Sequence, residues 1–165
     1  MSPSKEPYVV TREQGQAIWF LDTLMVFKAT GESTGKALSL IEQVLPPGFA
    51  PPLHIHHGED EAFYILEGAL TFVCGEHRWQ VDAGSFIFLP KDIAHGFLVE
   101  GTEPARLLQF AVPTGLEQFH VEMGQPATSL TLPLPTPPDL AKLQILSAKY
   151  GIELVGPPVE HEESQ

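Results

Sequence analysis

Glycine and proline interrupt this chain too often for a fold built mainly from helices. The 165 residues include 14 glycines and 16 prolines, and most of these fall between short apolar segments. In the middle of the chain such turn residues recur about every ten residues, a spacing that favours a β-sandwich or barrel. We therefore predict an all-β fold with antiparallel strands.

The middle of the chain has the pattern of several short strands joined by tight turns. Strands are predicted at residues 37–44, 62–66, 69–73, 78–81, 85–89, 96–99 and 105–112. Glu67-Gly68 and Gly75-Glu76 are typical of two-residue hairpin turns. The sequence thus predicts two hairpins here.

Two later segments have helical periodicity. Leu116 to Met123 and Asp139 to Tyr150 space their apolar residues at intervals of three and four. Pro137-Pro138 before the second segment and Gly151 after it are typical start and stop signals of a helix. We therefore expect two helices after the barrel.

The segment between these helices, Gln125 to Pro138, contains five prolines and is predicted to be an extended strap. Leucines alternate within it as though one side were packed, namely Leu130, Leu132 and Leu134. Residues 1–165 then form a single domain, with a barrel core at about 30–113 and the strap and helices at 114–158.

Composition excludes several classes of protein. The formal net charge of −12 repels a nucleic-acid backbone and an anionic lipid surface alike. The longest apolar runs are five residues, too short to span a membrane. The single cysteine, Cys74, cannot form an internal disulfide and is predicted to be a small buried hydrophobe. The first seven residues lack the apolar core of a secretory signal, so we expect a cytoplasmic protein.

Three histidines and a glutamate stand beside predicted strands. His54 and His56 are two residues apart, so both face the same side of an extended strand, and Glu61 returns on the next strand. A curved or closed sheet could bring His95 to the same point. By the same alternation His57 faces away. Histidines in such a Pro- and Gly-rich stretch are also often solvated, and this interpretation remains open for the pair.

The four residues together have the composition of a metal site. Three neutral imidazoles and one carboxylate suit a divalent transition metal such as Fe, Mn, Co, Ni, Cu or Zn. Calcium and magnesium prefer shells made of oxygen atoms. We therefore predict His54, His56, Glu61 and His95 as metal ligands.

The spacing of these residues resembles the two sequence motifs of the cupin superfamily. The first motif is matched without a gap by Gly48, His54, His56, Glu61 and Gly68. The second motif is resembled by Gly84, Pro90, Asp92 and His95. This resemblance implies a small antiparallel jelly-roll barrel with the four ligands inside it.

The second motif departs from the family pattern at two positions. Asp92 stands where the motif has glycine, which is tolerable because aspartate enters the left-handed region more readily than most residues. Val99 stands where the motif usually ends in asparagine, which makes the expected cavity more apolar. This favours a hydrophobic substrate.

A narrower resemblance covers most of the chain. Segments 51–57, 60–68, 86–90, 105–108, 150–153 and 156–158 resemble single-domain bacterial cupins of the quercetinase-like group. Enzymes of that group with an assigned activity open a flavonol with dioxygen and release carbon monoxide and a depside. The resemblance implies a metal-dependent dioxygenase acting on a small aromatic substrate and O2, and a homodimer. Glu61 would be the catalytic base, with a pKa raised by desolvation in the apolar barrel.

Alternation along the strands predicts the lining of the barrel. Phe63 and Ile65 should face inward with Glu61, together with Phe86 or Phe88, Phe97 and Val99, while Tyr64 packs outside. The same residues could equally be core packing. Three further histidines are predicted to be solvated, namely His77, His120 and His161.

Three functions are consistent with these features. The first is a metal-dependent dioxygenase of flavonols or related enolisable aromatics. The second is another metal-dependent cupin enzyme, such as an isomerase or lyase of a small keto acid or sugar derivative. The third is a non-catalytic cupin that binds a small molecule or metal. Few Arg or Lys residues lie near the motifs, which disfavours an acidic or phosphorylated substrate.

Overall fold

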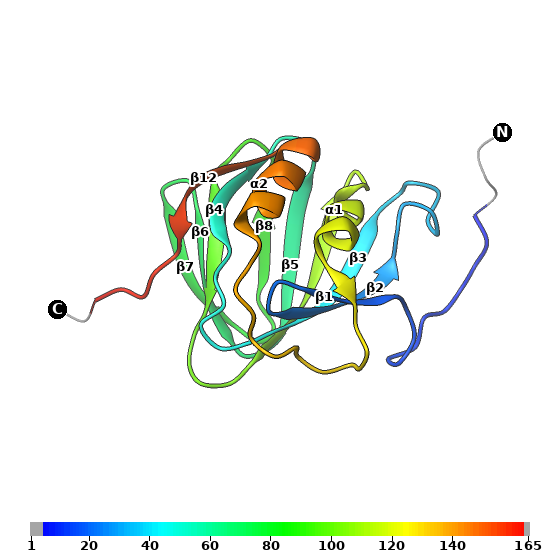
Figure 1. Cartoon of the computed structure of the whole chain (residues 1–165), viewed down its shortest axis with the longest axis horizontal. Coiled ribbons are helices and arrows are strands. Elements are labelled where there is room, and N and C mark those ends of the chain that lie inside the picture. Colours follow the sequence, from blue (N-terminus) through cyan, green and yellow to red (C-terminus); the bar gives the residue numbers. More distant parts are fainter. Residues whose placement is uncertain (1–4, 164–165) are drawn as a thin grey trace.

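The chain folds into two antiparallel sheets packed face to face, with two helices beside them (Figure 1). This arrangement is seen in a computed structural model that describes residues 5–163. It confirms the predicted all-β, jelly-roll fold with C-terminal helices.

Each sheet is built from strands that are distant in the sequence. The larger sheet has the order β11 (Gln125–Pro126), β1 (Ala17–Phe20), β2 (Thr23–Ala29), β3 (Ser39–Leu45), β10 (Ala105–Val112), β5 (Asp60–Glu67) and β8 (Phe86–Leu89). The smaller sheet has the order β12 (Ile152–Pro158), β4 (Pro52–His56), β9 (His95–Val99), β6 (Ala69–Cys74) and β7 (His77–Asp82). The sheet structure begins before residue 30, because β1 and β2 continue the larger sheet beyond β3.

Alternation along several strands contributes to the core between the sheets. Buried and partly buried residues alternate along β3 and along β10, as expected for strands with one face against a core. Phe72, Ile65 and Leu107 from the two sheets are fully buried in one cluster. Burying such a side chain contributes about 1.5–3 kcal/mol, so this cluster holds the sheets together.

One of the two predicted hairpins is wrong. Gly75-Glu76 does join a paired hairpin, β6 to β7. At Gly68, however, the chain passes from β5 in the larger sheet to β6 in the smaller one. Gly68 has a φ of +90°, and a Cβ added there would lie 2.9 Å from Cα of Ala105. Glycine is therefore needed for both its backbone conformation and the close approach of the neighbouring chain.

Strand β8 shows that the prediction for Phe86 and Phe88 was wrong. Both side chains are exposed, whereas Ile87 and Leu89 are buried. Both faces of this strand are apolar, so alternation alone does not determine which set enters the core. Tyr64 lies outside the core, as predicted, and is paired across the strands with Phe86.

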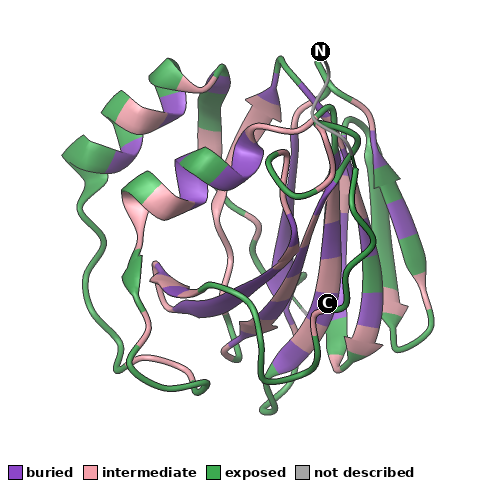
Figure 2. Cartoon of the chain, turned by 90° about the vertical axis from the view of Figure 1, so that its right-hand side faces the viewer, coloured by how far each residue is buried: buried purple, intermediate pink, exposed green. Residues whose placement is uncertain are grey.

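The helices are α1 (Leu116–Met123) and α2 (Leu140–Lys149), close to the predicted ranges. The Asp139 carboxylate accepts a hydrogen bond from the Lys142 backbone N–H and caps α2. Both helices lie on the same side of the molecule, and each carries buried and exposed residues (Figure 2). In the described part of the chain, neither helix is long and apolar enough to cross a membrane.

The strap between the helices has bends at residues 128–131, and its predicted packing is wrong. Leu130 and Leu134 are exposed, and Leu132 is only partly buried. The strap is attached instead by polar contacts, because the Trp19 indole N–H donates to the Thr131 carbonyl over 2.9 Å. The leucine alternation therefore does not mark a buried face.

Candidate metal centre

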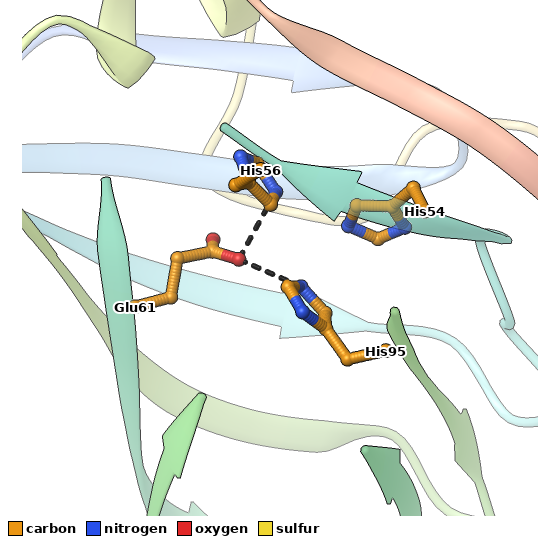
Figure 3. A group of neighbouring side chains, drawn as sticks. All are labelled: His54, His56, Glu61 and His95. Carbon is orange, nitrogen blue, oxygen red and sulfur yellow. Dashed lines mark hydrogen bonds and ion pairs between the residues drawn. The ribbon is translucent and has the colours of Figure 1, made fainter. Parts of the chain in front are cut away.

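Strands from both sheets carry the four predicted metal ligands (Figure 3). His54 and His56 lie two residues apart on β4, so their side chains project to the same side. His95 begins β9 and is paired directly with His54. Glu61 is the second residue of β5 in the other sheet. Face-to-face packing of the sheets brings all four side chains together.

The four ligand atoms are close enough to hold one metal ion. One atom of each side chain lies within 4.8 Å of every other. Oε2 of Glu61 is 3.0 Å from Nε2 of His56 and 2.9 Å from Nε2 of His95 (Figure 3). These three residues are 3%, 4% and 2% exposed, respectively. A buried set of three imidazoles and one carboxylate fits a divalent transition metal.

The Nδ1 atoms of His54, His56 and His95 each have a hydrogen-bond acceptor nearby. An Nδ1–H that donates to an acceptor leaves the Nε2 lone pair free for a metal and fixes the orientation of the ring. The three pairs are His54 with the Pro52 carbonyl (2.6 Å), His56 with the Glu59 carboxylate (2.6 Å) and His95 with the Ile93 carbonyl (3.2 Å). The orientations of the imidazoles are therefore compatible with metal binding through Nε2.

Two buried glutamines hold the other oxygen of Glu61. Gln109 on β10 donates from Nε2 to Oε1 of Glu61, and Gln43 on β3 donates from Nε2 to Oε1 of Gln109. The sequence analysis did not predict a role for either glutamine. A detectable signal was present, because each is a polar residue at an inward position of an alternating strand, between apolar residues.

Burial and neighbouring charges set the protonation of this cluster. Burial, with help from His95 and His56, lowers the pKa of His54 to about 4. Burial also opposes the charge on His56, but the carboxylates of Glu61 and Glu59 outweigh it and raise the pKa of His56 to about 10. Burial alone would raise the pKa of Glu61, but His56 outweighs burial and holds it well below the usual value. The prediction of a raised pKa for Glu61 is therefore wrong.

His57 faces away from the cluster, as its position next to His56 predicts. Its ring is exposed and lies 2.8 Å from carboxylate oxygens of both Asp92 and Glu153. Asp92 has a φ of +66°, which confirms that the second motif places a left-handed residue at this position. His57 thus ties the Asp92 turn to β12 on the outside of the barrel.

The prediction for the remaining histidines is correct for two of them and wrong for His120. His77 and His161 are exposed. His120 is 5% exposed, because α1 turns this side chain toward Phe20 of β1, with ring centroids 4.8 Å apart. It lines the same cavity as His54, His56, Glu61 and His95, which are called the metal-ligand cluster below.

That cavity is mostly apolar. Its lining includes five phenylalanines, namely Phe20, Phe49, Phe63, Phe97 and Phe119. None of the lining residues in the described part of the chain is Lys or Arg. Phe63 and Phe97 therefore line the cavity as predicted, whereas Ile65 and Val99 are buried in the core between the sheets. The cavity volume is about 80 Å³.

Comparisons with known proteins agree with this architecture. Residues 41–111 match the family model described as a cupin domain. The chain is 23% identical over 122 residues to quercetin 2,3-dioxygenase of Bacillus subtilis, covering 74% of this chain and 36% of that protein. It is 30% identical over 79 residues to an uncharacterized protein of Methanocaldococcus jannaschii, covering 48% of this chain and 63% of that protein. The chain thus spans less than two thirds of either relative.

A solved structure shows the same fold. The crystal structure of a predicted oxalate decarboxylase from Thermotoga maritima matches with a TM-score of 0.58 and 24% identity, covering 65% of this chain and 99% of that one. The jelly-roll fold, the His/Glu cluster and the family match together identify residues 41–111 as a cupin domain.

Proposed function

We propose that this chain is a metal-dependent dioxygenase that opens a neutral, enolisable aromatic substrate, such as a flavonol, with O2. The observation that carries the proposal is the combination of four metal-binding side chains with an apolar cavity. Three imidazoles and one carboxylate converge in the wall of an apolar, phenylalanine-rich cavity, and no lining residue in the described part of the chain is Lys or Arg. Similarity to part of a quercetin 2,3-dioxygenase supports the same reaction class.

The four residues His54, His56, Glu61 and His95 would hold the metal. A divalent transition metal at this position would acidify a coordinated enolic hydroxyl and promote its reaction with dioxygen. Glu61 would take up the enolic proton; because its pKa is lowered, it is a weak base here and needs a hydroxyl that is already acidified. The phenylalanines exclude water and pack against the substrate rings. The protein would thus position the substrate, accept its proton and exclude water from the site.

The cavity volume restricts the size of the substrate. Pockets for drug-sized ligands usually have about 300–1,000 Å³, much more than the roughly 80 Å³ of this cavity. A single ring with a 3-hydroxy-4-ketone is therefore the best match to the cavity as it stands. A flavonol carries further rings and would need a wider cavity, which movement of α2 could provide because Leu143 and Ser147 of this helix form part of the wall.

The other two functions fit the cavity less well. An isomerase or lyase of a keto acid or sugar derivative requires polar or cationic groups around its substrate, and most of this wall is apolar. The small volume is the one observation that favours such a substrate. A non-catalytic cupin would bind the same metal and ligand without turnover.

We also propose that the chain forms a homodimer through the β8 end of the larger sheet. β8 is the last strand of this sheet. Its outer face carries Phe86 and Phe88, which are 63% and 52% exposed, next to Tyr64 on β5. A second copy that pairs with this strand would cover both its backbone edge and its apolar face.

The dioxygenase proposal is tested by metal analysis followed by oxygen consumption. Protein purified without a histidine tag is analysed for bound metal and then reloaded with each divalent ion in turn. Oxygen uptake is followed with quercetin and with a monocyclic 3-hydroxy-4-pyranone. We expect uptake with at least one metal and substrate, accompanied by release of carbon monoxide.

Matched histidine variants provide the control. His54→Ala removes a ligand from the cluster and should abolish metal retention and oxygen uptake. His57→Ala removes the adjacent, outward-facing ring and should retain both. Metal-loaded protein that consumes no oxygen with either substrate would contradict the dioxygenase and favour the isomerase or lyase.

A further inference from the structure

Two polar side chains in the cavity have no hydrogen-bond partner. Within the described residues, Nδ1 of His120 on α1 and Oγ of Ser147 on α2 are buried and unpaired. These residues are only 5% and 1% exposed. Leaving a polar group buried and unpaired costs about 1–3 kcal/mol, and native proteins contain few such groups. Two of them lining one cavity indicate a place where a ligand supplies the missing partners.

The surroundings of His120 keep its ring in a fixed position and neutral. Phe20 packs edge-on against it at 4.8 Å between ring centroids, and Phe119 lies at 5.4 Å. Burial lowers the pKa of His120 to about 4. A neutral imidazole offers one donor and one acceptor, and a serine hydroxyl offers both functions. Such a pair recognises an uncharged hydroxyl or carbonyl rather than an anion.

The cavity therefore has two polar regions with different chemistry. The metal-ligand cluster comes from strands β4, β5 and β9, whereas His120 and Ser147 come from the two helices. Apolar side chains such as Phe20, Met25 and Leu143 make up much of the remaining wall. Both helical residues lie outside the segment 41–111 that matches the cupin family model. They are thus additions to the common barrel.

We propose that His120 and Ser147 determine substrate specificity by hydrogen-bonding a neutral hydroxyl or carbonyl on a part of the substrate other than its metal-binding group. The inference rests on the proposed function, since it assumes a substrate anchored at the four-residue cluster. The substrate class is then an enolisable aromatic ring with a second, uncharged polar substituent.

A matched pair of ligands tests this proposal by binding. Kojic acid and allomaltol share the same hydroxy-ketone on a pyranone ring, but kojic acid has a hydroxymethyl group where allomaltol has a methyl group. Dissociation constants are measured without oxygen on the metal-loaded protein. We expect kojic acid to bind about tenfold more tightly, the effect of one or two net hydrogen bonds. Ser147→Ala and His120→Phe should each reduce this preference toward onefold.

The controls are Ser129→Ala and His161→Phe, which make the same chemical changes at exposed positions. Both should retain the preference for kojic acid. Because the measurement is a ratio for two ligands on one protein, partial loss of folded protein does not alter it. Equal binding of the two ligands to the unmodified chain, or a preference that survives both cavity variants, would overturn the proposal.

A second measurement separates failure of this inference from failure of the proposed function. If neither pyranone binds, the proposed anchoring of the substrate is wrong. Phenol and toluene are then titrated into the protein and the ¹⁵N resonances of the His120 ring are followed. Tighter binding of phenol, with a shift of these resonances that Ser147→Ala reduces, would support the polar pair. Equal binding of phenol and toluene, as expected if the pair only holds water, would refute it.

Discussion

Replacing Gln109 with methionine tests whether the two buried glutamines fix the carboxylate of Glu61. Methionine has a similar length but removes two hydrogen bonds, one donated to Glu61 and one accepted from Gln43. A hydrogen bond to an ionised group contributes about 1.5–3 kcal/mol, and the unpaired amide of Gln43 costs about 1–3 kcal/mol. The free energy of unfolding should therefore fall by about 2.5–6 kcal/mol. In a chain of this length that lowers Tm by at least about 5 °C.

The same change should weaken metal binding. Loss of a group that orients a metal ligand typically costs about 10- to 100-fold in affinity. Gln43→Met is the matched control, since it leaves the hydrogen bond from Gln109 to Glu61 in place. It should reduce metal affinity less than Gln109→Met. The double variant should cost less stability than the sum of the single variants, because neither glutamine is then left unpaired.

Stability is measured by urea unfolding in the presence of a chelator, and metal affinity by competition with a coloured chelator. Circular dichroism at the start of each titration checks that all three variants are folded. The reasoning would be refuted if Gln109→Met bound metal as tightly as the unmodified chain. Strictly additive stability losses would show that the two glutamines do not act as a connected pair.

Three further predictions concern the turn at Gly68, the protons of the metal centre and the dimer. Gly68→Ala should destabilise the chain by more than Gly84→Ala in urea unfolding, because the two glycines have similar positive φ values but only Gly68 closely approaches Ala105; equal losses would exclude this contact as the cause. Metal binding at pH 7 should release a proton from His56, because its pKa is raised to about 10, and metal affinity should rise with pH up to that value. Calorimetry in buffers of different ionisation enthalpy measures this proton release. A binding heat that does not depend on the buffer would show that no proton is released. Phe88→Glu should convert the dimer into a monomer, which light scattering would show as a halved molar mass. An unchanged mass would contradict an interface at β8.

Protonation of His56 also affects folding stability in the absence of metal. Its folded pKa of about 10 lies above the usual histidine value of 6.5, so its pairing with Glu61 stabilises the fold fully below pH 6.5. This contribution is lost as the pH rises from about 6.5 to 10. Glu61 has a lowered pKa, so its contribution is present above its usual value and is lost on acidification.

The metal-ligand cluster could be predicted because it depends on local alternation and on motif spacing. His54 and His56 share a side of β4 for any strand at this position. The convergence of His95 and Glu61 with them depended on the resemblance to cupins, since alternation alone does not fix which strands become neighbours. The structure brings all four together.

Other features depend on tertiary packing that local patterns do not encode. His120 was predicted to be solvated because a short helix does not reveal which of its faces docks against β1. Phe86 and Phe88 alternate with Ile87 and Leu89, so two opposite orientations of β8 bury equally apolar residues. Gly68 has the sequence of a hairpin turn, yet it connects two sheets. In each case the deciding partner is distant in the sequence.

The pairing of β12 with β4 couples the C-terminal segment to the metal centre. Ile152 pairs with His56 and Leu154 pairs with His54, and α2 ends immediately before β12. A large ligand that pushes α2 outward would therefore pull on the strand that carries two of the three imidazoles. The position of α2 and the geometry of His54 and His56 are therefore linked through this pair of strands.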